Sequence, residues 1–348
     1  AGVYSCVEPS DAVDILRTTE TPRTARLSSE RAWASACAVG ETVVVAGGGT
    51  SREKSAAGDA VDVATATVAA NTSALSVARW GIACAVAGDK AYFGGGIGGP
   101  HSEYAKTIDV FDGASWTVAP FELSDEREST GAIGANHTVS FVGGWNELFD
   151  EPNSAAVDTF DVASGAASSS TISGPAYWPG GAVVRGTEYA VDNAFLNVRP
   201  RGARDWTSTP LPECLSGPSE LPLKSYESGG AVPGEHVPQN GVAVACLACF
   251  YGAKDTRLQY SVDRFLDLDD EPSGGPAVHC FNTETETWLA PLRCAARHKA
   301  GGIAAVGDTI YVAAGYDPAD PYNTPTDVVD VFHNVADGRC AAAAAAEE

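Results

Sequence analysis

Short apolar segments separated by glycine-rich turns recur along most of this chain. The clearest copies are residues 31–49 (RAWASACAVGETVVVAGGG), 79–96 (RWGIACAVAGDKAYFGGG), 127–144 (RESTGAIGANHTVSFVGG) and 297–315 (RHKAGGIAAVGDTIYVAAG). The leading arginines of the first three copies are 48 residues apart at each step. Each copy has the pattern of two short buried strands joined by a Gly-Asp or Gly-Glu type turn, where positive φ is tolerated. The chain is therefore expected to fold into repeated β-hairpins, with weaker copies near Ala176 and Ser228.

Two further strands follow each hairpin in the pattern. A third strand places Asp among β-branched and apolar residues, as in residues 60–63, 108–111, 157–160 and 328–332. A fourth strand often carries Trp, as in residues 115–118, 205–207 and 287–289. Each repeat of about 48 residues therefore predicts one four-stranded sheet.

The repeat resembles the Kelch family, including the central propeller of galactose-oxidase-like proteins. Family features are the Gly-Asp turn, the second strand ending in Gly-Gly, an aromatic on the third strand and a spaced Trp, as in residues 281–288. The similarity covers residues 31–175 and 277–332 well and the middle of the chain poorly. It implies an all-β, Kelch-type β-propeller, a closed ring that hides nearly all sheet edges. A solenoid is the competing architecture, but consecutive antiparallel hairpins favour blades.

The number of blades follows from the third-strand segments, which number seven. They lie at residues 12–16 and near Val61, Ile108, Val157, Phe195, Ala277 and Val328. We therefore expect seven blades in a single domain over residues 1–348, with residues 1–30 supplying strands that close the ring. Six blades is the alternative. Residues 341–348 form a low-complexity tail.

Composition supports a large core and narrows the classes of partner. Hydrophobic residues make up 44% and charged residues 19% of the 348 residues, which argues against disorder. The formal net charge of −23 disfavours a nucleic-acid partner, because the chain would repel a phosphate backbone. No apolar run reaches the length needed to span a bilayer, although a peripheral place in a membrane complex stays open.

Cysteine, methionine and glycosylation motifs bear on the compartment. The chain has no Met, even at position 1, which suggests a processed end and a secreted or organelle-lumen protein, with a cytoplasmic one as the alternative. Cys37 and Cys84 both occur in Ala-Cys-Ala-Val and are expected to be free, buried residues. Cys246 and Cys249 have CxxC spacing, but positions i and i+3 of a strand face opposite sides, so no metal site is expected. A disulfide within the group from Cys246 to Cys294, or one from Cys6 to Cys340, is left open. The chain has two Asn-X-Ser/Thr sequons, at Asn71 and Asn136, and this number is no more than chance would give.

The arginines that begin the repeats are the first candidates for binding. They are Arg31, Arg79, Arg127 and Arg297. Other Kelch propellers use arginines in this region to hold acidic peptides, since guanidinium captures carboxylates in bidentate fashion. The alternative, which we favour, is that they brace neighbouring blades by bonding carbonyls and the third-strand Asp.

Loops after the second strands are the other candidate surface. They span residues 49–59, 96–107, 144–156, 251–276 and 316–327, and the fourth is the longest. Long loops on rigid scaffolds commonly carry function. Their aromatic residues would anchor an interface and include Tyr104, Trp145, Phe149, Tyr260, Phe265, Tyr316 and Tyr322.

The sequence gives no catalytic fingerprint. The six histidines match no copper-radical oxidase string, Asp112 to Trp116 fails sialidase-box spacing, and the glycine triplets are periodic turns rather than phosphate loops. A sugar epimerase-like enzyme could use Glu227, Glu235 or His298 as acid or base, but nothing selects them. We therefore expect a non-catalytic scaffold that binds a partner protein through its blade loops, without cofactor or metal. An enzyme using the channel mouth is the alternative.

Overall fold

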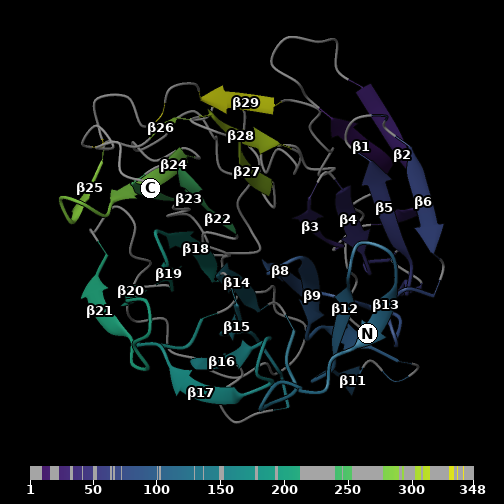
Figure 1. Ribbon diagram of the computed structural model, residues 1–348, viewed down its shortest axis with the longest axis horizontal. Helices are drawn as coiled ribbons and strands as arrows, with labels where there is room; N and C mark the ends of the chain where they lie inside the picture. The colour runs from purple at the N-terminus through teal and green to yellow at the C-terminus, as the bar shows by residue number, and fades with distance from the viewer. Residues whose placement is uncertain are drawn as a thin grey trace, which may run out of the picture. The chain divides into compact units, whose positions relative to one another are not determined.

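The structure is a computed structural model whose strands are drawn in Figure 1. It describes residues 10–15, 23–31, 34–40, 42–49, 53–62, 65, 67–71, 73–99, 101, 103–128, 130–135, 137–148, 153–176, 179–192, 195–211, 240–244, 246–252, 277–289, 292–293, 302–306, 309–313, 329–332, 335 and 340. Throughout these residues the regular secondary structure is β-strand, and the strands pair antiparallel. In the same part of the chain no helix is long and apolar enough to cross a membrane.

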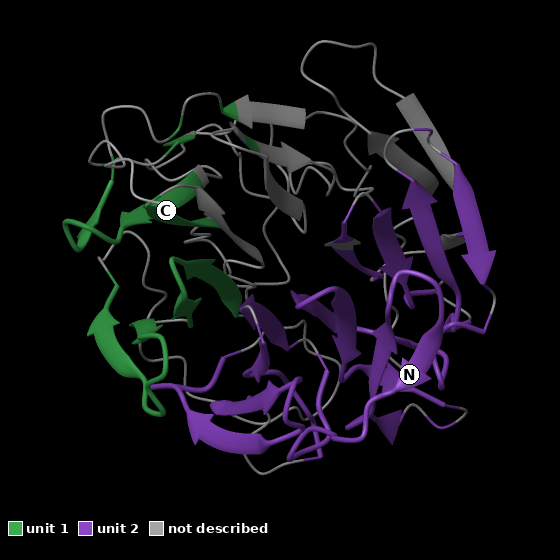
Figure 2. Cartoon of the chain, viewed as in Figure 1, with its two compact units in different colours: residues 1–6, 179–348 green, residues 7–178 purple. Residues whose placement is uncertain are grey.

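The chain divides into two compact units, coloured separately in Figure 2. One consists of residues 7–178 and the other of residues 1–6 and 179–348. We call them the N-terminal and the C-terminal unit. Each is described by itself below.

The N-terminal unit holds three four-stranded sheets among its described residues, each an antiparallel meander. The first is β3 (Ser35–Val39), β4 (Thr42–Ala46), β5 (Gly58–Asp62) and β6 (Val68–Asn71). The second is β8 (Ala83–Ala87), β9 (Lys90–Gly94), β12 (Ile108–Phe111) and β13 (Trp116–Val118). The third is β14 (Gly131–Ala135), β15 (Thr138–Val142), β16 (Ala156–Asp161) and β17 (Ala167–Thr171).

Five more strands complete the description of this unit. A hairpin pairs β1 (Ser10–Ile15) with β2 (Arg23–Arg31), and β2 packs against β5 and β6. A small three-stranded sheet joins β7 (Arg79–Trp80), β10 (Ile97–Gly98) and β11 (Glu103–Tyr104). This small sheet extends the loops at one end of the second meander.

The C-terminal unit repeats the same pattern. Its first sheet is β18 (Gly180–Val184), β19 (Thr187–Val191), β20 (Phe195–Arg199) and β21 (Thr207–Pro210). The next is β22 (Asn240–Val244), β23 (Leu247–Gly252) and β24 (Ala277–Asn282), whose outer edge pairs with both β25 (Thr287–Trp288) and β26 (Leu292–Arg293). The last is β27 (Gly302–Val306), β28 (Thr309–Ala313) and β29 (Val329–Phe332).

Burial falls from the second and third strands of a meander to the fourth. Strand β9 is buried apart from its first residue and β12 is buried throughout, whereas β21 is exposed throughout and β17 nearly so. The sequence explains this gradient, because strands 2 and 3 carry Phe, Tyr, Val and Ile, and β17 is Ala-Ser-Ser-Ser-Thr. A sheet covered on both faces by neighbours needs apolar residues on both faces of its strands.

Consecutive sheets pack face to face within each unit. Apolar residues of the first meander, including Val44 and Ala46, meet Phe93 and Phe111 of the second. The other face of the second meander, with Tyr92 and Ile108, meets the third. In the C-terminal unit the first and second sheets share one core, and the second and third share another. The described residues are thus all β and form antiparallel sheets, mostly of four strands, that stack within each unit, which is consistent with a β-propeller-like fold.

First strands consist of small residues because neighbouring sheets approach there most closely. At Gly134 in β14, an added Cβ would lie 1.9 Å from the carbonyl oxygen of Val86 in β8. Only glycine fits a backbone-to-backbone approach of that kind.

In the N-terminal unit, the glycine pair after each second strand links one sheet to the next. Gly95 and Gly96 have φ values of 68° and 100°, as expected for a sharp turn. The N–H of Gly96 donates to the carbonyl of Arg127 at 2.9 Å, in front of the following meander. Gly48 donates to Arg79, and Gly144 to Ala176, in the same way. These three hydrogen bonds form an inter-sheet clasp in each repeat of the unit.

The expectation that Cys37 and Cys84 are free is wrong. The two cysteines form a disulfide that links β3 to β8. The two cysteines differ by one residue in strand register: Cys37 lies three residues before Gly40 of its turn, and Cys84 lies four before Gly88. Because side chains alternate along a strand, this offset directs the two sulfurs toward each other across adjacent sheets.

The cysteines of the CxxC motif belong to two separate disulfides. Cys246 pairs with Cys340, and Cys249 pairs with Cys280 across β23 and β24. The Cys249–Cys280 disulfide lies within the group from Cys246 to Cys294 in which one was left open, whereas Cys340 pairs with Cys246 and not with Cys6. Cys6 and Cys294 themselves lie outside the described residues.

The seven segments predicted as third strands all fall on strands: β1, β5, β12, β16, β20, β24 and β29. The closing of a ring by residues 1–30, a single domain over residues 1–348 and the number of blades stay predictions. Residues 341–348, predicted as a tail, lie outside the described residues.

Candidate functional site

The meander topology brings two kinds of connection to the same end of the N-terminal sheets. Segments after second strands and segments before first strands both leave the sheet at this end. We call it the loop end; it comprises residues 47–49, 53–57, 73–78, 95–99, 103–107, 119–128, 143–148 and 153–155. It contains three of the five loops predicted to bind.

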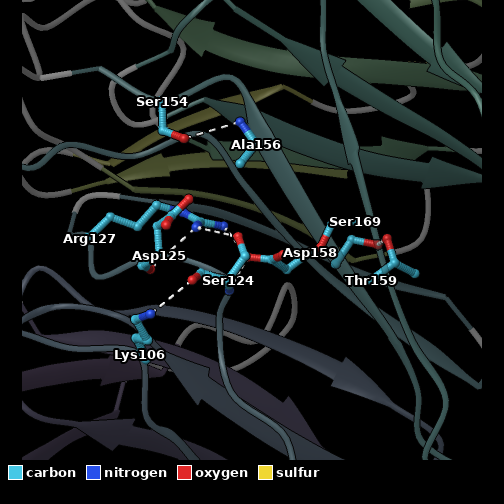
Figure 3. Close-up of polar contacts among 10 residues, drawn as sticks. Lys106, Ser124, Asp125, Arg127, Ser154, Ala156, Asp158, Thr159 and Ser169 are labelled. Carbon is cyan, nitrogen blue, oxygen red and sulfur yellow. Dashed lines mark hydrogen bonds and ion pairs between the residues drawn. The ribbon is translucent and has the colours of Figure 1, made fainter. Parts of the chain in front are cut away.

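The repeat arginines lie beneath this end, in a buried ion pair with the third-strand aspartate. Arg127 is fully buried, and its Nη2 lies 2.6 Å from Oδ2 of Asp158. The same carboxylate accepts hydrogen bonds from the backbone and side chain of Ser124 and from the hydroxyl of Ser169, as Figure 3 shows. Burial by itself would raise the pKa of the Asp158 carboxyl, but Arg127 and these hydrogen bonds hold it below its usual value.

Arg79 repeats the arrangement one sheet earlier. Its Nη2 lies 2.7 Å from Asp109, and it donates to the carbonyls of Phe93, Gly95 and Thr107. Burial lowers the pKa of its guanidinium, and the charge of Asp109 opposes that shift. With no exposed surface and with donors directed to internal acceptors, Arg79 and Arg127 have the geometry of braces. They bond to carbonyls and to the third-strand Asp, as the bracing alternative expects, but these partners lie in, or directly before, each arginine's own repeat, so bracing between neighbouring blades stays a prediction. We leave both arginines out of the proposed binding surface.

A serine three residues before each arginine completes the motif. Ser28, Ser76 and Ser124 are 48 residues apart, and their backbone N–H groups donate to Asp59, Asp109 and Asp158, which occupy the same position of the third strand. In the first repeat this is Asp59 and not Asp62, the aspartate of the segment 60–63 predicted as third strand. The signal was present in the sequence as a second periodic residue, but the sequence reasoning did not use it. In the fourth copy the strand register puts Ala176 at the arginine position and Asn197 at the aspartate position. A buried aspartate would be costly without its arginine, so an uncharged pair replaces both.

Above the braces, the loop end carries aromatic and charged groups from all three meanders. The backbone of Trp145 exchanges hydrogen bonds with the backbone of Glu128. The ring of Trp145 lies 5.9 Å from that of Tyr104, edge to face. The ammonium of Lys54 lies over the Trp80 ring at 5.2 Å. Trp145, Tyr104, Lys54 and Trp80 are only partly exposed or buried, so these rings also hold the loops together.

Glu128 is the residue with the most perturbed carboxyl group in this region. Burial and the nearby charge of Glu147 raise its pKa from 4.5 to about 7, and Lys54 opposes the shift. The carboxyl group lies against Gly81, where an added Cβ would come within 2.7 Å of Glu128 Oε2. Sequence reasoning missed this residue, because it follows Arg127 at a position where the other clear copies have Ala32, Trp80 and His298.

The turn after Trp145 presents an apolar side chain to solvent. Leu148 is 77% exposed, more than any other large hydrophobic residue that the structure describes. The buried Asn146 fixes this turn: its amide donates to the Glu126 carbonyl at 2.7 Å, and its Oδ1 accepts the N–H of Leu148 at 2.9 Å. Leu148 is therefore held at a defined position in solvent.

Acidic side chains predominate among the exposed charged residues of the loop end, and Glu147 directly precedes Leu148. The exposed carboxylates of the described loop end are Glu53, Glu103, Glu122, Asp125, Glu126 and Glu147. The lysines there, Lys54 and Lys106, are partly buried, and Lys106 donates to the Ser124 carbonyl. A surface with this charge would attract cationic groups.

Several predicted site residues fall outside what the structure describes. They are Phe149, Tyr260, Phe265, Arg297 and Tyr316, and the acid–base candidates Glu227, Glu235 and His298. Arg31 ends β2, and its side chain is not described. Within the described ranges, no group of three or more His, Cys, Asp or Glu side chains could hold a metal ion.

Comparison with known proteins adds no family assignment. No protein-family model matches the chain, and no curated protein sequence matches it significantly.

Proposed function

We propose that this chain is a Kelch-type β-propeller of seven blades that acts as a non-catalytic scaffold in a secreted or organelle-lumen setting. Six blades is the alternative count. The Kelch type is supported by the repeat of about 48 residues, with its Gly-Gly clasp and third-strand Asp. Three disulfides among the described residues support the compartment, because such bonds persist in oxidising environments.

The scaffold binds a partner protein through the loop end. The observation that carries this proposal is Leu148, an exposed leucine on a turn that Asn146 fixes by two hydrogen bonds. A preorganised apolar side chain lowers the entropic cost of binding. The exposed carboxylates of the loop end match a partner whose apolar pocket is bordered by Lys or Arg.

Photo-crosslinking tests the proposal directly. A photoreactive residue is placed at position 148 and, as a control, at Val118, a 55% exposed residue on the outer strand β13. We expect a discrete adduct with one partner protein from position 148 in cells of the source, and none from position 118. The absence of an adduct at 148, with the chain folded and disulfide-bonded, would refute the loop end as the interface.

Once the partner is identified, replacing Leu148, the expected anchor residue, measures how much this side chain contributes to the binding affinity. Leu148→Ala should weaken binding about 10-fold, because a buried anchor residue contributes more than ~1 kcal/mol. Val118→Ala should leave the affinity unchanged, and raising the salt concentration should weaken binding by the wild-type chain. Equal effects of the two substitutions would contradict the proposal.

A second candidate function is acid–base chemistry on a small molecule at Glu128. The observation that favours it is the pKa of about 7, which suits a group that takes and gives a proton near neutral pH. A substrate-dependent reaction abolished by Glu128→Gln, in a chain whose crosslinking from position 148 is intact, would support this candidate.

A further inference from the structure

We propose that Asn71 is an N-glycosylation site. It begins the sequon Asn71-Thr72-Ser73, which is the acceptor motif of this modification in secreted proteins. Asn71 is the last residue of β6, the outermost strand of the first meander, and its side chain is exposed. A glycan there would extend into solvent without entering the packed sheets.

The amide group of Asn71 has the accessibility that the reaction needs. Its Oδ1 accepts the N–H of Ser73 at 3.0 Å, which fixes the side chain at the turn after β6. Within the described part of the chain, Nδ2 makes no hydrogen bond, and neither does the hydroxyl of Ser73. By contrast, the amide nitrogens of Asn146 and Asn197 lie in buried residues and are bound to acceptors.

The second sequon is less well suited to modification. Asn136 lies outside the described residues, but the hydroxyl of its Thr138 donates to the Ala135 carbonyl at 3.2 Å. Thr138 is also partly buried at the start of β15. We therefore assign the modification to Asn71 alone.

The modification rests on the secreted or lumenal setting proposed above, which the disulfides support. The Cys37–Cys84 disulfide lies in the same unit as Asn71. Cys37 is in β3, which belongs to the same sheet as β6, the strand that ends at Asn71. Disulfides persist in oxidising compartments, and the lumen of the endoplasmic reticulum is one of them, where lipid-linked oligosaccharides are transferred to sequons. Both modifications would therefore be acquired in one place.

The transfer requires a lipid-linked oligosaccharide pyrophosphate as co-substrate, with the transferase as catalyst. The Asn71 Nδ2 attacks the anomeric carbon of the sugar, and a C–N bond forms as the bond from that carbon to the phosphate oxygen breaks. The lipid pyrophosphate leaves with the bonding electron pair, and one amide proton passes to a base of the transferase. No group is oxidised or reduced.

The test is mass spectrometry of the chain purified from its source, before and after treatment with a peptide-N-glycosidase in heavy-oxygen water. We expect the peptide that contains Asn71 to carry a hexosamine-based glycan and to become Asp with heavy oxygen after treatment. An unmodified Asn71 overturns the proposal.

Three variants expressed through the same secretory route separate the site from general effects on folding. Asn71→Gln and Ser73→Ala should lose the glycan, whereas Ser73→Thr, which keeps the acceptor hydroxyl, should retain it. All three should keep the wild-type thermal unfolding midpoint after enzymatic removal of the glycan, because Asn71 and Ser73 are exposed. A glycan that persists in Asn71→Gln at the same mass would also overturn the assignment.

Discussion

At the scale of single residues, the repeat arginine and aspartate act as one unit. Removing one member leaves a buried charge without its counter-charge, which costs about 3–5 kcal/mol. Asp158→Asn should therefore lower the free energy of unfolding by that amount, measured by denaturant titration. Arg185→Ala is the control, because Arg185 is 57% exposed in its ion pair with Glu284 and such pairs contribute ~0–1 kcal/mol.

The fourth copy of the repeat suggests how this loss could be offset. Ala176 and Asn197 occupy the two positions there, so Arg127→Ala combined with Asp158→Asn should be more stable than Asp158→Asn alone. A double variant that is less stable than the single one would show that the arginine contributes mainly through its carbonyl contacts.

Glu128 should make stability depend on pH near neutrality. Its folded pKa of about 7 exceeds the usual 4.5, so the folded state holds the proton more tightly than the unfolded state. The stabilisation from this proton is complete below pH 4.5 and is lost as the pH rises through 7. At ~1.4 kcal/mol per pKa unit, the shift sets an upper limit of ~3 kcal/mol.

Glu128→Gln removes this dependence. Relative to the wild type, the variant should gain stability between about pH 5 and about pH 8 in urea titrations. Glu147→Gln should reduce the dependence without abolishing it, because Glu147 contributes to the raised pKa but burial contributes more. A difference between Glu128→Gln and wild type that stays constant with pH would contradict the assigned cause.

At the scale of elements, the close approach of first strands sets a strict limit on side-chain size. Gly134→Ala would place a methyl group 1.9 Å from a backbone oxygen that belongs to β8. We expect a loss of about 1–3 kcal/mol in unfolding free energy, the usual cost of overpacking.

A glycine in a turn separates this clash from a backbone effect. Gly165 has a φ of 74° and no atom within 4 Å of an added Cβ, so Gly165→Ala carries only the cost of left-handed backbone, ~1 kcal/mol. Gly134→Ala should cost more than Gly165→Ala, and the reverse order would mean that β14 can move away from β8.

Strand positions could be predicted from the sequence, whereas side-chain partners could not. Alternating apolar residues and glycine turns mark β8, β9 and β12 locally, so no tertiary information is needed. The Cys37–Cys84 disulfide depends on a one-residue difference in register between two hairpins that look alike in sequence. The exposure of Leu148 depends on two hydrogen bonds of Asn146, which no periodic pattern indicates.

At the scale of the whole molecule, the net charge of −23 and the buried ion pairs belong to one pattern. The buried aspartates Asp109 and Asp158 are each matched by an arginine inside their sheet, so these two carboxylates add nothing to the uncompensated charge. Composition gives the size of this excess, and the absence of a nucleic-acid partner stays a prediction from it. Composition could not show that exposed carboxylates and one exposed leucine lie at the same end of the sheets, which requires the folded loop end.

The inter-sheet clasp has a consequence for how such a chain can grow. Each clasp joins a glycine N–H of one copy to the carbonyl at the arginine position of the next, in Gly48–Arg79, Gly96–Arg127 and Gly144–Ala176. Both partners are backbone groups, so the bond survives the change from Arg to Ala. A duplicated segment would bring its own donor for the copy that follows and its own acceptor for the copy before. Gene duplication by whole repeats could therefore lengthen the array with every clasp preserved, while side chains diverge freely.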